Sequence, residues 1–274
     1  MMAYQRTMVA VSAIVALAAT ACGSSGNDDT TGPGASNGSP NGGSTDGSDF
    51  IDDPFEGTDD PSLGEEACGS DLIGIVRDFK DSHPDFEERV AEDRGLVEAQ
   101  LGQDGKPVYA GGPEGTVTTS GPEAFDQWFR DVPDVNMAVQ VSIPLTSNGD
   151  GTSTYDNPDF FPIDDQGFGN EERRHNYHFT LELRTKFEYK GGEVFTFRGD
   201  DDLFTYINGR LAIDLGGVHG PELATIDLDA SAQELGITPG NSYTLDFFFA
   251  ERHTTESNFR IDTSIGCFTP VVPR

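Results

Sequence analysis

Basic residues are scarce in this sequence of 274 residues: Lys and Arg together number 17 against 48 Asp and Glu, which gives a formal net charge of −31. A surface of that sign repels phosphate groups, so it argues against nucleic acids and anionic lipid headgroups as partners. Met occurs four times and Trp once, whereas Phe occurs 19 times. The composition therefore predicts a phenylalanine-rich core, with another part of the chain unable to fold.

Signatures of catalysis are also missing or uninformative. The sequence has no glycine loop of the phosphate-binding kind and no dinucleotide-binding fingerprint. Paired acids are the machinery of glycoside hydrolysis, but acids are so abundant here that any pair can be imagined. We therefore expect a protein that is not an enzyme, with an enzyme acting on glycans as the minor alternative.

The first apolar run predicts export. Residues 8–19 are apolar, follow Arg6 and are too short to span a bilayer, which is typical of a secretory signal over residues 1–21. The small residues before Cys22 resemble the cleavage box of bacterial lipoproteins, in which the cysteine carries the lipid. This resemblance implies lipid anchoring at Cys22, with Gly23 favouring the outer membrane or cell surface. Ordinary secretion, with Cys22 incidental, is the alternative.

The segment after the signal differs sharply from the rest. Residues 22–67 contain no Lys or Arg and consist mainly of Gly, Ser, Asn, Asp, Thr and Pro. Such a composition buries too little apolar surface to fold, so we expect a disordered, acidic tether. The two other cysteines, Cys68 and Cys267, lie near the two ends of residues 68–274. In an exported protein they are expected to form a disulfide, with two free buried thiols as the alternative.

From residue 68 onward, apolar residues alternate with polar ones in short runs that are typical of β-strands. The clearest run covers residues 177–183, where Tyr, Phe and Leu alternate with His, Thr and Glu. Further candidate strands cover residues 72–79, 137–145, 195–197, 203–207, 211–215, 243–249 and 259–265. With a hairpin signal at Asn208-Gly209, these runs predict one all-β domain over residues 68–274, an antiparallel β-sandwich or barrel. Short helices are expected only at residues 86–100 and 122–130.

Several stretches resemble the signature of the fibro-slime domain family. The longest is FTFRGDDDLFTYINGRLAIDLGGVH at residues 195–219, and shorter ones are DNPDFFPI at 156–163, AERH at 250–253 and SNFRID at 257–262. That family resembles the anthrax protective-antigen-type β-barrels, which include calcium-dependent lectin domains of yeast flocculins and bacterial adhesins. The resemblance covers roughly residues 72–266 and implies a protective-antigen-type β-barrel.

The resemblance also implies a metal site. In those lectins two consecutive aspartates, joined by a cis peptide bond, hold a calcium ion that also coordinates sugar hydroxyls. Asp200 and Asp201 match this pair, and Glu251 is expected as the third ligand, with Asn258 as the alternative. Calcium prefers such oxygen ligands, although a solvated acidic turn is the simpler interpretation of three adjacent aspartates. The expected contacts to the bound ligand are Asp202, His219, Arg252 and His253.

Taken together, the sequence predicts a lipid-anchored, cell-surface binding module that uses calcium to recognise carbohydrate or a matrix glycoconjugate. The only expected membrane contact is the lipid anchor, and no nucleic acid is expected as a partner. The alternative is a structural or adhesive surface protein in which calcium only stiffens the loops and the partner is another protein.

Overall fold

A computed structural model describes residues 68–87 and 89–271, so the predicted signal, Cys22 and the predicted tether lie outside the described residues. The strands and helices are β1 (Asp71–Phe79), β2 (Ala91–Glu92), α1 (Pro122–Phe125), β3 (Asn136–Pro144), β4 (Thr146–Ser147), β5 (Ser153–Asn157), β6 (Phe179–Tyr189), β7 (Val194–Gly199), β8 (Asp202–Ile207), β9 (Arg210–Leu215), β10 (Gly217–Val218), β11 (Glu222–Asp227), α2 (Leu228–Leu235), β12 (Asn241–Glu251), β13 (Phe259–Thr263) and β14 (Thr269–Pro270).

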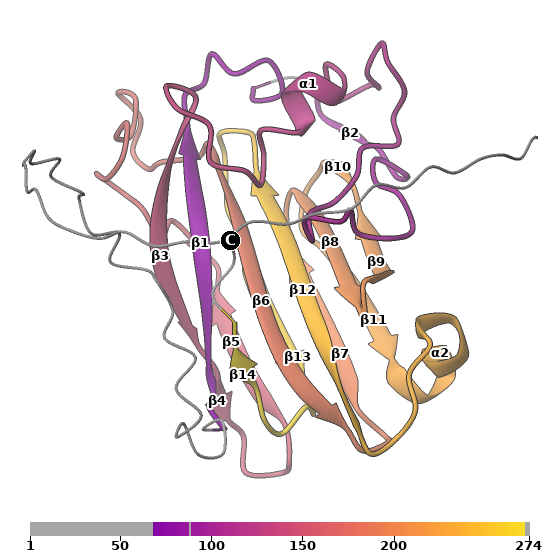
Figure 1. The fold of residues 1–274 in the computed structure, drawn as a ribbon. Coiled ribbons are helices and arrows are strands. Elements are labelled where there is room, and N and C mark those ends of the chain that lie inside the picture. Colours follow the sequence, from indigo (N-terminus) through magenta and orange to yellow (C-terminus); the bar gives the residue numbers. More distant parts are fainter. Residues whose placement is uncertain (1–67, 88, 272–274) are drawn as a thin grey trace, which may run out of the picture. The chain divides into compact units, whose positions relative to one another are not determined.

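Two main sheets organise these strands (Figure 1). A seven-stranded sheet has the order β3-β1-β6-β12-β8-β9, with β14 beside β6, and a five-stranded sheet has the order β11-β7-β13-β5-β4. All strand pairs are antiparallel. The main core, rich in Phe, Leu and Ile, is formed by side chains from both sheets. The predicted all-β, antiparallel fold is confirmed.

The central strands of the larger sheet are buried on both faces. In β12, Phe247 and Phe249 belong to the main core, whereas Phe248 and Ala250 belong to a second apolar cluster on the opposite face. All six residues of β8 are buried as well. An uninterrupted apolar run is typical of strands that are covered on both sides, as the Phe247–Ala250 run shows here.

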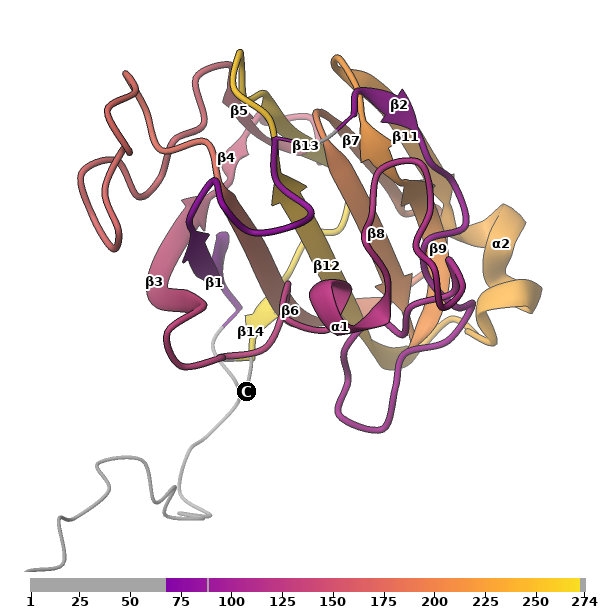
Figure 2. The ribbon, with the colours of Figure 1, turned by 90° about the horizontal axis from the view of Figure 1, so that it is seen from above.

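The cover on the outer face is the segment 80–135, which joins β1 to β3 and contains β2 and α1. Figure 2 shows its loops and α1 beside β8 and β12. Its apolar residues Leu96, Phe125, Trp128 and Phe129 pack with Phe248 of β12 in the second cluster. The segment therefore has a core of its own, built against the outer face of the seven-stranded sheet.

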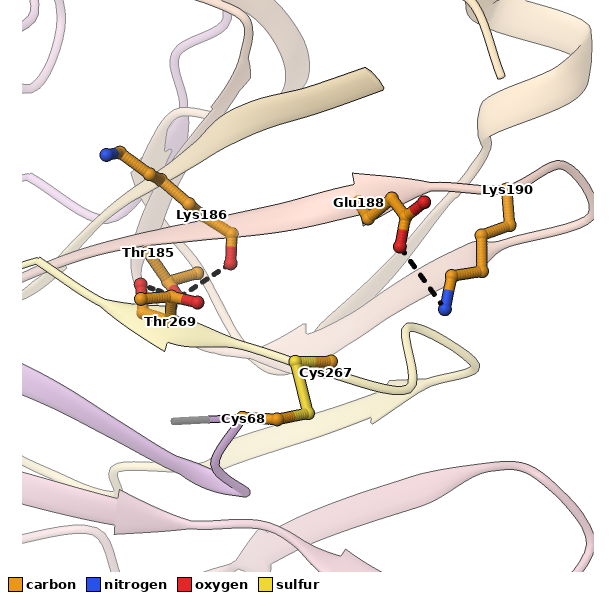
Figure 3. The surroundings of a disulfide bond; sticks show 7 residues. All are labelled: Cys68, Thr185, Lys186, Glu188, Lys190, Cys267 and Thr269. Atoms are coloured by element: carbon orange, nitrogen blue, oxygen red, sulfur yellow. Dashed lines mark hydrogen bonds and ion pairs between the residues drawn. A yellow bond between two sulfur atoms is a disulfide. The ribbon is translucent and has the colours of Figure 1, made fainter. Parts of the chain in front are cut away.

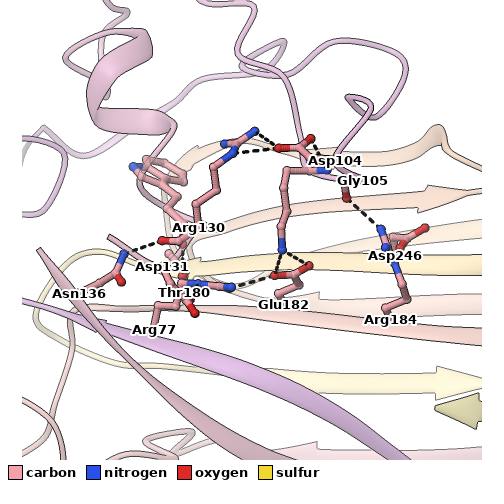
Figure 4. A network of polar contacts seen from close by, with 12 residues as sticks. Arg77, Asp104, Gly105, Arg130, Asp131, Asn136, Thr180, Glu182, Arg184 and Asp246 are labelled. Carbon is pink, nitrogen blue, oxygen red and sulfur yellow. Dashed lines mark hydrogen bonds and ion pairs between the residues drawn. The ribbon is translucent and has the colours of Figure 1, made fainter. Parts of the chain in front are cut away.

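Charged groups fix this segment in place (Figure 4). Glu182 of β6 is 1% exposed and accepts hydrogen bonds from Arg77 Nη1 at 2.9 Å and from Lys106 Nζ at 2.6 Å. Arg184 of β6 donates to the carbonyl oxygen of Gly105 at 2.9 Å. A buried charge that loses its partner is very costly, so these contacts permit few other positions of the segment on the sheet.

A disulfide joins Cys68, just before β1, to Cys267, just before β14 (Figure 3). The two Cα atoms are 5.2 Å apart and the cysteines are 199 residues apart in sequence. The predicted pairing is confirmed. Closing a loop of this length removes chain entropy from the unfolded state and contributes about 4–5 kcal/mol to stability in the chain-entropy model.

The helix expected at residues 86–100 does not form, because its backbone groups find partners elsewhere. Asp93 N donates to Gly216 O and Glu98 N donates to Val108 O, each at 2.8 Å. Of the second expected helix, residues 122–130, only the four residues of α1 are helical. Helix α2 was not expected from the sequence. It follows Asp227, whose side chain accepts from Ala230 N as an N-terminal cap.

Candidate functional site

The chain crosses from one sheet to the other at Asp200 and Asp201. These residues lie between β7, in the five-stranded sheet, and β8, in the seven-stranded sheet, and a cis peptide bond joins them. Gly199, the last residue of β7, has no room for a side chain, because a Cβ there would lie 2.3 Å from Asn258 O. The aspartate pair therefore lies where both sheets end, with a neighbouring loop packed closely against it.

Strand register brings the other expected ligands to the same end. Phe259, the first residue of β13, pairs with Gly199, which places Asn258 beside Asp200. Ala250 of β12 pairs with Asp202, which places Glu251 beside Asp201. The four residues predicted as metal ligands thus meet at one place, although they come from segments about fifty residues apart.

Both aspartates are buried and bonded to the surrounding loops. Asp200 accepts from Asn258 N at 2.6 Å and from Asn258 Nδ2 at 3.0 Å. Asp201 accepts from His219 N at 3.0 Å and from Arg252 N at 3.1 Å. Together the two carboxylates connect the loop after β10 and the loop after β12 to the start of β8.

Of the three carboxylates at this site, that of Glu251 has the fewest hydrogen-bond partners. It is 1% exposed, and its Oε2 has no hydrogen-bond partner among the described residues. Burial, together with the charges of Asp201 and Asp200, raises the pKa of Glu251 well above its ordinary value. A buried oxygen without a partner costs free energy, so this group would gain from a bound cation or proton.

The arrangement fits a hard divalent cation in its chemistry. Three buried carboxylates and the Asn258 amide are the oxygen donors that calcium prefers, and a carboxylate oxygen with one hydrogen bond keeps a lone pair for a metal. Among the described residues, however, no group of three or more His, Cys, Asp or Glu side chains already converges as a metal-binding cluster. Coordination by the whole set therefore requires side chains such as Glu251 to turn.

A small cavity of about 160 Å³ opens beside the aspartates. Asp200, Asp201, His219 and His253 line it, so two of the four expected ligand contacts are at the cavity. The sequence did not single out the other residues that line it, namely Val90, Val218, Gly220, Thr255 and Glu256. Val90 comes from the segment 80–135, and no local pattern in the sequence indicated that this segment reaches the site.

The structure corrects the expectation that Asp202 and Arg252 contact the ligand. Both are fully buried, and neither lines the cavity. Arg252 Nε donates to Asp202 Oδ2 at 2.6 Å, and its Nη1 donates to the carbonyl oxygens of Asp85 and Thr118 at 3.1 and 2.7 Å. Its guanidinium also lies 4.7 Å from the centre of the Trp128 ring. Arg252 and Asp202 thus form a buried ion pair next to Asp201, and Arg252 connects this pair to the segment 80–135.

Without calcium, the protein is expected to lose stability as the pH rises from about 6 to about 8. Unfolded chains ionise their aspartates near pH 4, whereas burial raises the pKa of Asp201 to about 8 in the folded protein. In this window the folded state therefore binds more protons than the unfolded state. Its stability then falls with rising pH, by up to about 1.4 kcal/mol per pH unit for one group.

Thermal unfolding in the presence of EDTA at several pH values measures this dependence. Added calcium should flatten it by taking the place of the proton, and the Asp201→Asn variant should show less of it even without the metal. A melting temperature of the EDTA-treated protein that stays constant or rises between pH 6 and 8 would contradict the assignment.

Comparison with known proteins identifies part of the chain. Residues 146–268 match the PA14 domain. The chain is 40% identical over 205 residues to protein psiR of Dictyostelium discoideum, covering 69% of this chain and 20% of that protein. It is 39% identical over 185 residues to protein psiD of the same organism, covering 63% and 36%. The chain thus spans about a fifth to a third of the length of these curated relatives.

Solved structures are similar at low sequence identity. The PA14 domain of the antifreeze protein MpAFP is 11% identical with a TM-score of 0.32, over 80% of this chain and 98% of that one. The Epa9 A domain from Candida glabrata, solved with Galβ1-4GlcNAc, is 10% identical with a TM-score of 0.33, over 72% and 85%. The match of residues 146–268 to the PA14 domain agrees with the protective-antigen type that the sequence predicts, and the fibro-slime assignment stays a prediction.

No helix in the described ranges 68–87 and 89–271 combines the length and the apolar character that crossing a bilayer requires.

Proposed function

We propose, from the PA14 match of residues 146–268, that this domain is a calcium-dependent carbohydrate-binding module displayed at the cell surface. The observation that carries the proposal is the meeting of Asp200, Asp201 and Glu251 at one end of the sandwich, where burial raises the pKa of each. Calcium bound there would supply a hard cation with coordination positions left for sugar hydroxyls.

The cavity beside the aspartates supports a small ligand. Its volume of about 160 Å³ is below the roughly 300–1,000 Å³ of pockets for drug-sized molecules, so it suits a single ring. Among the described residues that line it, His253 and Thr255 offer hydrogen-bonding groups for a polar ligand. We propose a binding function without catalysis, since carbohydrate recognition needs only these contacts and the metal.

The remaining parts of the proposal concern the rest of the chain. The fibro-slime resemblance, the signal at residues 1–21 and the lipid on Cys22 describe an exported protein anchored in the outer membrane, with residues 22–67 as the spacer. Growth with radiolabelled palmitate tests the anchor, because a Cys22→Ser variant should lose the label. Label retained by that variant would contradict lipidation at this cysteine.

One observation favours the second candidate, a surface protein in which calcium is purely structural. Asp200 and Asp201 already accept hydrogen bonds from Asn258, His219 and Arg252, so a cation there would also stiffen the loops that meet at this end. Under that function a protein partner would bind elsewhere, and glycan binding would be absent.

Calcium is expected to bind with a measurable heat, to raise the melting temperature and to be required for glycan binding. Isothermal titration with calcium, followed by a glycan array with and without EDTA, tests this. Calcium binding with no glycan signal would favour the structural alternative. A flat titration and a melting temperature unmoved by EDTA would rule out both metal-dependent functions.

A further inference from the structure

The segment 80–135 lies outside the residues that match the PA14 domain, yet part of it borders the cavity. Its second apolar cluster and the buried charges of Glu182 and Lys106 hold it on the outer face of the seven-stranded sheet (Figures 2 and 4). Residues of this segment that reach the cavity are therefore positioned before any ligand arrives, which lowers the entropy cost of binding.

Glu87 connects the segment to the loop that follows β12. Glu87 N donates to Arg252 O at 2.9 Å, and its carboxylate accepts from Thr254 N at 3.1 Å. The same carboxylate also accepts from His178 Nε2 at 2.8 Å. The loop held in this way is the one that contributes His253, Thr255 and Glu256 to the cavity.

A second connection follows a few residues later. Ala91 of β2 pairs with Val218 of β10, immediately before His219, another residue that lines the cavity. Val90 lies between this pairing and the Glu87 contacts, so the chain is fixed on both sides of it. Its side chain is nevertheless 66% exposed and lines the cavity next to Asp200 and Asp201.

We infer that Val90 is a specificity-determining contact of the ligand site, and that it selects a neutral sugar ring with an exposed C–H face. The inference rests on the proposed function. Hydroxyls on one edge of such a ring would point to Asp200 and Asp201, while the apolar face packs against the valine. Asp200, Asp201 and Glu256 give the cavity negative groups, and among the described residues no Lys or Arg lines it, which disfavours sialylated or sulfated sugars.

The Val90→Ser variant tests the contact, because it removes apolar surface at an exposed position where folding depends little on the side chain. Val108→Ser is the matched control: Val108 lies in the same segment and is 39% exposed, but it does not line the cavity. Each protein is titrated with calcium alone. It is then applied in calcium to an array of neutral galactose, mannose, glucose, fucose and N-acetylglucosamine glycosides, with sialylated and sulfated counterparts.

We expect wild type and Val108→Ser to bind the same neutral glycosides, and Val90→Ser to bind them about tenfold more weakly with unchanged calcium affinity. Unchanged glycan binding by Val90→Ser, an equal loss in Val108→Ser, or a loss of calcium affinity in Val90→Ser would overturn the role of Val90 and leave the proposed function standing. Calcium binding by wild type without any glycan signal would overturn both this inference and carbohydrate recognition. A preference of wild type for the charged glycosides would overturn the assignment of a neutral sugar.

Discussion

Replacing Asp201 by Asn is expected to lower the affinity for calcium by more than about 100-fold. The amide keeps the size of the side chain and one acceptor for the N–H groups of His219 and Arg252, but it removes a negative charge from the proposed ligand set. Loss of groups that merely support metal ligands costs about 10–100-fold in affinity, so loss of a ligand should cost more. Isothermal titration with calcium measures the change.

The matched control is Asp150→Asn, which removes the same charge from an exposed position between β4 and β5, at the end of β5 away from the site. Its calcium affinity should stay within about twofold of wild type, since charges that are exposed and distant are screened by salt. Equal losses of affinity in the two variants would indicate that calcium binding depends on the net charge of the protein alone. Unchanged affinity in Asp201→Asn would remove this residue from the proposed ligand set.

The Arg252→Met variant is expected to lose about 3–5 kcal/mol of unfolding free energy. Arg252 is fully buried and holds Asp202, also fully buried, through two hydrogen bonds of 2.6 and 3.1 Å. Methionine fills much of the space but leaves the carboxylate of Asp202 without its counter-charge, and breaking a buried pair on one side costs this much. For a domain of this size the melting temperature should fall by roughly 10 °C.

The surface arginine Arg260 provides the control. It is 38% exposed and pairs with Asp156 and Asp262, so the Arg260→Met variant should lose no more than about 1 kcal/mol. The double variant Arg252→Met/Asp202→Asn should recover part of the stability lost in Arg252→Met, because the unpaired charge is gone. Similar melting temperatures for the Arg252 and Arg260 variants would show that the buried pair does not hold this end of the sheet together.

Most of the strands could be predicted because period-two alternation is a local property. Residues 177–183 alternate in this way, and β6 begins at Phe179. The alternation over residues 137–145 predicts a strand with one apolar face, but that face is buried along only part of the strand. Met137 is 44% exposed, whereas Ile143 is 1% exposed. β3 is the edge strand of its sheet, and an edge is covered along only part of its length, which alternation does not reveal.

The two errors in the helix prediction have different causes. The helix α2 has an aspartate cap at its start and Gly236 in a left-handed conformation at its end, so these local signals could have predicted it. The helix expected at residues 86–100 fails for a non-local reason. There the backbone N–H of Asp93 bonds to Gly216, which lies far outside any window around it, and that of Glu98 bonds to Val108, beyond the reach of a helical turn.

The aspartate pair and its partners were predicted by resemblance, and strand register explains why they meet. Arg252 was misplaced because a charged residue next to a ligand-binding loop resembles a surface contact. Its burial depends on Trp128, Asp85 and Thr118 in a segment more than a hundred residues earlier. Val90 was missed for the same reason, since only the packing of that segment brings it to the cavity.

Alternation, turn residues and the two cysteines were enough to determine an antiparallel β-domain closed by one disulfide, because each depends on neighbouring residues or on redox compartment. Tertiary structure alone decided which acidic side chains line the cavity and which are buried away from it. Asp201 and Asp202 are adjacent in sequence, yet one faces the cavity and the other faces Arg252. The reason is that successive side chains of an extended chain point to opposite sides, and what covers each side comes from distant parts of the sequence.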